Sequence, residues 1–313
     1  MNNVASIEST ESMAEKKLMK RKALYFIVLT FSFSYLLAGT YYILGGRIEN
    51  VGFMYMAILY MFIPMIMAIV LQKFVYKDSL KVLGINFKVN RWWLVAWLLP
   101  LFLSLLTLGI SLIMPGVQFS PGMEGFVARL SGTLTPEQLD MLKTQIASAP
   151  YLIFVSALIQ GLIYGPTINA VAAFGEEYGW RGFLQKQYSY LGFWKMSLII
   201  GIIWGFWHAP IIIQGYNYPQ NPVLGVFMMI GFTVLLTPLI VYIRIRSGSV
   251  ITAAIMHGCI NATAGLSLLF TTGGSDLTVG LMGLAGFIAM AIVNLVLLVY
   301  DRKFSGEPVM CIN

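Results

Sequence analysis

Residues 223–243 read VLGVFMMIGFTVLLTPLIVYI, a run without a single charged side chain. An α-helix rises about 1.5 Å per residue, so about 20 apolar residues cross the roughly 30 Å hydrocarbon core of a bilayer. This stretch therefore predicts a helix that spans a membrane.

The rest of the chain repeats this pattern. Hydrophobic residues make up 58% of the sequence and charged residues 11%, which indicates that lipid rather than water surrounds most of the protein. Seven further apolar stretches are long enough to span, at about 23–45, 52–72, 92–114, 151–174, 193–214, 249–270 and 278–300. The fourth stretch should continue as a helix to about 188. The sequence predicts an all-α membrane protein with about eight transmembrane helices.

The basic residues are distributed unevenly along these spans. If the spans alternate in direction, 17 of the 20 Lys and Arg residues fall on one side, and only Arg47, Arg129 and Lys143 fall on the other. By the positive-inside rule the basic side is cytoplasmic, so we expect a multi-pass protein of the cell membrane with both termini in the cytoplasm. The formal charge of +7 then reflects topology, and we expect the lipid bilayer rather than nucleic acid as its partner.

The connections between spans are mostly short, and no internal repeat is present. We expect one multi-span domain over 23–303, between a cytoplasmic amino-terminal tail at 1–22 and a carboxyl-terminal tail at 304–313. The longest connection, 115–150, lies on the external side. In it, Thr135-Pro136-Glu137-Gln138 predicts a helix start with a capping box.

Ionisable side chains interrupt three of the apolar segments, and such groups in a bilayer mark a functional site by default. Glu176 lies sixteen residues before Gly192, where the turn between the fourth and fifth spans is expected, and His208 lies sixteen after it. Both should therefore lie about 20 Å along their helices from that turn. The seventh span enters from the same side, and His257 is eleven residues beyond Arg246. Three helices thus bring polar groups to one depth and predict a polar intramembrane cavity.

The spacing of the neighbouring polar residues suggests how these groups are paired. Glu177 and Arg181 are four residues apart and can form an ion pair, which leaves Glu176 free for catalysis. His257 and Asn261 share a helix face and could together stabilise an oxyanion. The structural alternatives are a salt-bridge cluster for the charged residues and an interhelical contact for His257 with Asn261.

At these residues the chain resembles the CAAX-prenyl-protease and bacteriocin-processing family of intramembrane proteases, the CPBP or Abi family. Its Glu-Glu-x-x-x-Arg motif matches residues 176–181, and its His-x-x-x-Asn motif matches 257–261. Its aromatic-x-x-x-His motif matches 204–208, with Trp204 where phenylalanine is usual. The resemblance covers about 150–270, which would be the protease core of the domain.

This resemblance implies peptide-bond hydrolysis in a water-filled cavity that is open towards the cytosol. The catalytic roles fall on the six motif residues. Glu176 with His208 would activate water. Glu177 and Arg181 would order the site. His257 with Asn261 would stabilise the tetrahedral oxyanion.

The metal requirement stays open at the level of sequence. Members of the family are commonly labelled metalloproteases, and Glu176, His208 and His257 could form a three-ligand site for a divalent metal such as zinc. The chain contains no His-Glu-x-x-His motif. A water activated by glutamate without a permanent metal is the other mechanism that the resemblance implies.

The leading hypothesis is an intramembrane endopeptidase acting on a peptide or a membrane-protein segment that arrives from the cytosolic leaflet. One alternative is a non-catalytic membrane scaffold or bacteriocin-immunity protein with the same fold. All six motif residues are intact, which argues against it, since binding alone does not need a general base. A proton-coupled transporter using Glu176 and His208 as a relay is less favoured, because no repeat is present.

Overall fold

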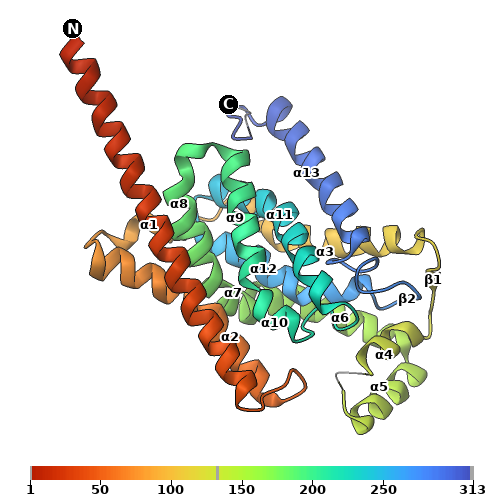
Figure 1. The fold of residues 1–313 in the computed structure, drawn as a ribbon. Coiled ribbons are helices and arrows are strands. Elements are labelled where there is room, and N and C mark those ends of the chain that lie inside the picture. Colours follow the sequence, from red (N-terminus) through yellow and green to blue (C-terminus); the bar gives the residue numbers. More distant parts are fainter. Residues whose placement is uncertain (1, 132–133, 311–313) are drawn as a thin grey trace.

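The computed structural model describes residues 2–131 and 134–310, and helices account for most of them (Figure 1). The α-helices are α1 (Asn2–Ile43), α2 (Val51–Ile69), α3 (Arg91–Leu112), α4 (Glu124–Leu130), α5 (Pro136–Ser148), α6 (Pro150–Tyr164), α7 (Ala170–Glu177), α8 (Gln185–Tyr188), α9 (Phe193–Trp207), α10 (Ala209–Ile213), α11 (Pro222–Ser247), α12 (Val250–Thr263) and α13 (Leu284–Phe304). The two short strands β1 (Gln118–Phe119) and β2 (Thr271–Thr272) pair antiparallel.

Within the residues that the structure describes, seven helices are long and apolar enough to cross a membrane. They are Met13–Ile43, Val51–Val75, Arg91–Leu112, Tyr151–Leu191, Pro222–Ser247, Val250–Ser267 and Leu284–Phe304. The protein is therefore an all-α, multi-pass membrane protein, as the sequence predicted. The fourth span continues well beyond 174, because π-helical turns at Gly165–Asn169 and Tyr178–Leu184 join α6, α7 and α8 into one long helix. The first span shows no break at residue 22, since α1 is continuous through the expected tail.

The expected continuous span at 193–214 is wrong. This segment forms α9, with 15 residues, and the short α10, and the break between them falls at His208. Pro210 explains the break, because proline has no N–H to donate to the carbonyl four residues before it. His208 consequently lies at a helix end inside the bundle, where its backbone differs from that of a regular helix.

Two tyrosines hydrogen-bond the carbonyls that this break leaves free. The Phe206 carbonyl accepts from the Tyr35 hydroxyl of α1 at 2.7 Å, and the Trp207 carbonyl accepts from the Tyr60 hydroxyl of α2 at 2.5 Å. Backbone groups at membrane depth have no water to bond and need partners inside the protein. The first two helices therefore stabilise the broken helix that carries His208.

Glycines bring the helices of the core into backbone contact. A Cβ on Gly258 of α12 would lie 2.5 Å from both the Gly165 oxygen and the Ala170 nitrogen of the fourth span. A Cβ on Gly205 of α9 would lie 2.5 Å from the Ile230 Cα of α11. Only glycine permits these approaches, as is common where membrane helices pack closely.

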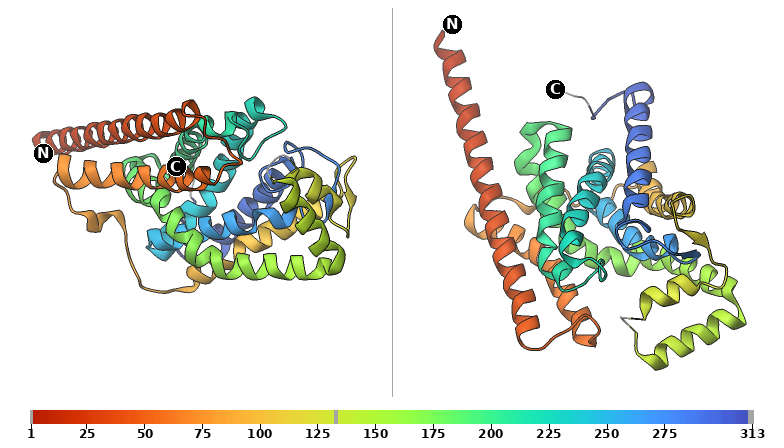
Figure 2. Two further views of the ribbon diagram at one scale, coloured as in Figure 1. Left: turned by 90° about the horizontal axis from the view of Figure 1, so that it is seen from below. Right: turned by 45° about the vertical axis from the view of Figure 1, so that its right-hand side comes forward.

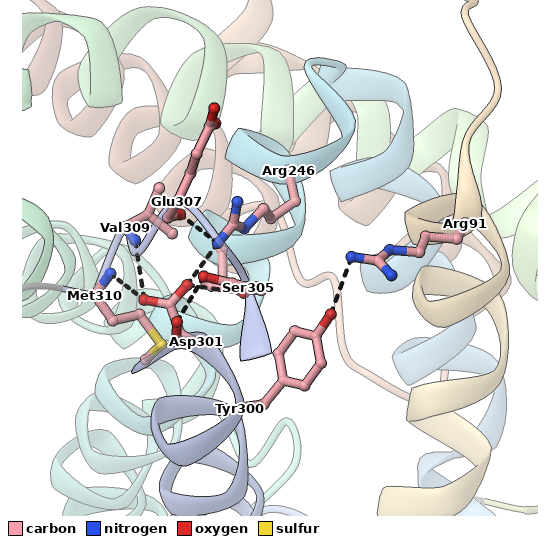
Figure 3. Close-up of polar contacts among 9 residues, drawn as sticks. Arg91, Arg246, Tyr300, Asp301, Ser305, Glu307, Val309 and Met310 are labelled. Carbon is pink, nitrogen blue, oxygen red and sulfur yellow. Dashed lines mark hydrogen bonds and ion pairs between the residues drawn. The ribbon is translucent and has the colours of Figure 1, made fainter. Parts of the chain in front are cut away.

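The carboxyl-terminal segment folds back onto the end of the bundle where both termini lie (Figures 1 and 3). The Asp301 carboxylate at the end of α13 is fully buried and accepts four hydrogen bonds. Arg246 Nη2 donates at 2.7 Å, the Tyr242 hydroxyl at 3.0 Å, and the backbone N–H groups of Val309 and Met310 at 2.9 and 2.7 Å. One buried carboxylate thus joins α11, α13 and the carboxyl-terminal segment.

Helices α4 and α5 lie at the other end of the molecule, away from both termini (Figure 2). The capping box expected at Thr135 is confirmed: its hydroxyl accepts from the Gln138 N–H at 3.3 Å, and its N–H donates to Gln138 Oε1 at 2.9 Å. The β1–β2 pair joins this region to the segment that follows α12. The molecule therefore has a basic end that carries the termini and an opposite end built from α4, α5 and the short strands.

Candidate active site

The Glu177 carboxylate joins two helices. Its Oε1 accepts from Arg181 Nη1 at 3.0 Å, which is the ion pair expected from their spacing. The same oxygen accepts from His257 Nδ1 of α12 at 2.9 Å. The sequence analysis paired His257 only with Asn261 and did not predict its contact with Glu177. Glu177 therefore fixes the orientation of the His257 ring, because a hydrogen bond at one ring nitrogen sets the plane of the ring and the role of the other nitrogen.

Arg181 is buried and has three kinds of partner. Besides Glu177, its Nη2 donates to Thr237 Oγ1 of α11 at 3.1 Å. Its guanidinium carbon lies 4.2 Å from the ring centroid of Trp204 on α9, a cation–π contact. Sequence reasoning missed Thr237, because an uncharged threonine in an apolar helix gives no signal of its own.

Trp204 also contacts the proposed general base. Its indole Nε1 donates to Glu176 Oε2 at 2.7 Å, and Glu176 is 2% exposed. The motif predicted only an aromatic ring at 204. The tryptophan that replaces the usual phenylalanine supplies an N–H group. This departure from the motif was the sequence feature that could have predicted the hydrogen bond to Glu176. The bond engages one carboxylate oxygen and holds the side chain in a defined orientation.

His208 is oriented by its own helix. Its Nδ1 lies 2.9 Å from the Trp204 carbonyl oxygen. A carbonyl can only accept, so Nδ1 carries the proton, and in the neutral ring Nε2 has a free lone pair. The Trp207 ring packs edge-on against His208 with 4.8 Å between ring centroids. These contacts define both the tautomer and the plane of the ring.

A cavity of about 200 Å³ brings the site residues together. Glu176, His208, His257 and Asn261 all line it, together with Trp204. Glu177 and Arg181 do not line it and lie buried behind it. The fourth span, α9 and α12 thus contribute to one site, as the depth argument predicted. Asn261 is exposed, one turn along α12 from His257.

The rest of the cavity wall extends away from the basic end of the molecule. Tyr216 and Asn217 come from the connection between α10 and α11, and Ala264 and Met282 come from the connection between α12 and α13. These connections lie on the side with few Lys and Arg residues. The opening towards the cytosol that the resemblance implies stays a prediction. The buried Arg181 is packed between Glu177 and Trp204.

The three candidate metal ligands do not form a ligand set. Among residues 2–131 and 134–310, no group of three or more His, Cys, Asp or Glu side chains is arranged to hold a metal ion. The bonds to Glu177 and Trp204 engage His257 Nδ1 and Glu176 Oε2 and leave His257 Nε2 and Glu176 Oε1 without a partner among the described residues. Metal dependence of Glu176, His208 and His257 stays a prediction for experiment.

Comparison with known proteins gives an independent result. Residues 157–263 match the family described as type II CAAX prenyl endopeptidase Rce1-like, and this segment contains all six candidate site residues. CAAX prenyl protease 2 of Methanococcus maripaludis is 32% identical over 147 residues, which are 44% of this chain and 49% of that protein. The chain thus spans about half the length of this curated relative. Over this segment the chain is therefore similar to the type II CAAX prenyl endopeptidases, in agreement with the resemblance of its motifs to the CPBP family.

Proposed function

We propose that this protein is an intramembrane endopeptidase that hydrolyses a peptide bond of a peptide or membrane-protein substrate. The observation that carries the proposal is the convergence of Glu176, His208, His257 and Asn261 on one cavity within the spans. Glu176 and His208 can accept a proton, and His257 and Asn261 can donate a hydrogen bond. All four side chains line the same cavity. Hydrolysis of an amide needs both kinds of group on opposite sides of the carbonyl.

The attacking water is activated by Glu176. The carboxylate takes a proton from the water as the water oxygen bonds to the substrate carbonyl carbon, and Trp204 holds the carboxylate in place during this step. Nε2 of His208 accepts the second hydrogen of the water as a hydrogen bond, which orients its lone pair towards the carbonyl. General base catalysis of this kind contributes about 10²–10⁴-fold in rate.

The developing oxyanion is stabilised by His257 and Asn261. With Nδ1 donating to Glu177, a protonated His257 offers Nε2–H to the oxyanion, and the Asn261 amide offers a second donor. In that state the charges of Glu176, Glu177, Arg181 and His257 sum to zero. When the C–N bond breaks, Glu176 returns its proton to the departing amine, and a carboxylic acid and an amine leave.

The membrane orientation is part of the proposal. The basic residues support cytoplasmic termini in the cell membrane. In that orientation, the cavity wall built from Asn217, Ala264 and Met282 faces the outside of the cell. With this orientation, we propose that the substrate reaches the site from the external leaflet, in place of the cytosolic entry that the resemblance implies.

The test is cleavage of a fluorogenic peptide library by purified full-length protein in detergent. Glu176→Gln keeps the shape of the side chain and its acceptor for Trp204 but removes the base, so we expect cleavage to fall at least 10²-fold. Glu137→Gln is the matched control, because Glu137 lies in α5 outside the cavity, and we expect it to cleave as wild type does.

Each preparation is assayed with and without a chelator. Cleavage that is lost in Glu176→Gln and survives chelation supports a glutamate-activated water. Loss on chelation, restored by added zinc, supports a metal-dependent reaction instead. Equal cleavage by wild type and Glu176→Gln would refute the assignment, and absence of cleavage by the wild type would favour a non-catalytic scaffold.

A further inference from the structure

A second hollow adjoins the catalytic cavity at the end away from the termini. We call it the distal groove. Its volume is about 540 Å³, and it shares Asn217, Ala264 and Met282 with the catalytic cavity. The carboxyl half of α4 and residues between Asp276 and Met282 form much of the rest of its wall. An extended chain that lies across the catalytic residues can therefore continue into the distal groove.

Arg129 of α4 is a basic residue in the wall of this groove. It is half-buried, and its Nη2 donates to the Gly273 carbonyl at 2.5 Å. Its Nε is buried and has no hydrogen-bond partner. Burial lowers the pKa of Arg129, and nearby Asp276 opposes this by raising it. The guanidinium is thus partly removed from water without a carboxylate bonded to it, so it retains unused capacity to bind an anion.

Asp276, the carboxylate in the same wall, is bonded to other groups. Its Oδ2 accepts from the Gln220 backbone N–H at 2.8 Å, and its Oδ1 accepts from Asn221 Nδ2 at 2.8 Å. These bonds tie the connection before α11 to the connection before α13. Within the part of the chain that the structure describes, Arg129 forms no ion pair. The groove therefore offers a guanidinium that no carboxylate pairs with among the described residues.

We propose that the distal groove is a specificity subsite of the protease, in which Arg129 binds a carboxylate of the substrate beyond the scissile bond. This inference rests on the proposed function. A carboxylate is the ligand that pairs with guanidinium in bidentate geometry. It can be an acidic side chain or the free carboxyl terminus of a peptide.

The test starts from any library peptide that the wild type cleaves and Glu176→Gln does not. A glutamate is moved through each position on both sides of the cleavage site, and each peptide is compared with its glutamine counterpart. A further pair has a free or an amidated carboxyl terminus. A hydrogen bond to a charged group contributes about 1.5–3 kcal/mol, so we expect kcat/KM to favour one carboxylate position by about tenfold or more.

Arg129→Gln should reduce that preference to a ratio near one, while Arg129→Lys retains part of it. The control is Arg47→Gln, because Arg47 lies in the α1–α2 connection outside both hollows and should keep the full preference. Preference for glutamate at an internal position identifies a side-chain ligand, and preference for the free terminus identifies a terminal one. Cleavage with no carboxylate preference, or a preference that survives Arg129→Gln, would overturn the subsite alone. Absence of any cleavage by the wild type would overturn both proposals.

Discussion

The buried pair of Glu177 and Arg181 gives a prediction whose size follows from the structure. Both side chains have zero exposure, and their atoms are 3.0 Å apart. Removing one partner of such a pair leaves an uncompensated buried charge and costs about 3–5 kcal/mol. We therefore expect Arg181→Met and Glu177→Gln each to lower the free energy of unfolding by about this amount. The double variant has no buried charge at either position. Its loss of unfolding free energy should be smaller than the sum of the two single losses by at least about 2 kcal/mol.

The measurement is reversible unfolding in mixed micelles, in which an anionic detergent is titrated and helix content is followed by circular dichroism. All variants are compared with the wild type at equal protein concentration and micelle composition. Thr237→Val serves as the control, because it removes one neutral acceptor from Arg181 and leaves the ion pair intact. Its expected cost is only about 1 kcal/mol.

Additive losses in the double variant would refute the reasoning, because they would mean that the two side chains contribute independently. A folded and fully stable Arg181→Met protein would refute it as well, since Glu177 would then be tolerated in the core without its cation. Peptidase activity separates stability from chemistry. Glu177→Gln still accepts from His257, so it should retain more activity than Glu176→Gln when both are assayed as folded protein.

Three further predictions test other parts of the structure. Trp204→Phe removes the N–H group bonded to Glu176 but keeps an aromatic ring, so kcat should fall about tenfold to hundredfold while the protein still folds. An unchanged kcat would mean that this hydrogen bond does not position the Glu176 carboxylate. Gly258→Ala forces a Cβ into neighbouring backbone and should cost about 1–3 kcal/mol of unfolding free energy, measured in the same micelles; wild-type stability would contradict this close approach. Ala128→Cys is made in a background with both cysteines replaced by serine. It should react with a membrane-impermeant maleimide added outside intact cells, because Ala128 lines the distal groove. Labelling only after lysis would mean that the protein has the opposite orientation in the membrane.

The sequence was sufficient for what depends on one helix at a time. Stretches of apolar residues predicted every span except the one at 193–214, and four-residue spacing predicted the pair of Glu177 with Arg181, because both follow from helix geometry alone. The common depth of Glu176, His208 and His257 also followed, since rise per residue is constant and the turns could be located.

Contacts between helices could not be predicted in the same way. Whether Glu177 meets His257, or Arg181 meets Thr237, depends on how each helix is rotated about its axis. Apolar helices in lipid give a weak signal of that rotation, because the faces towards lipid and towards protein are similarly hydrophobic. The break at His208 is different: Pro210 was visible, but the tyrosines that make the break tolerable lie about 150 residues or more away in sequence.

The contact of Gly258 with Gly165 and Ala170 has a further consequence for how the protein can move. Two helices in backbone contact lose that contact when they slide or separate, so we expect α12 and the fourth span to move as one unit. Glu176 and His257 belong to that unit. His208 lies at the junction of α9 and α10, where the helix is broken. In the proposed mechanism, a substrate that displaces α10 would therefore move His208 relative to Glu176 and His257.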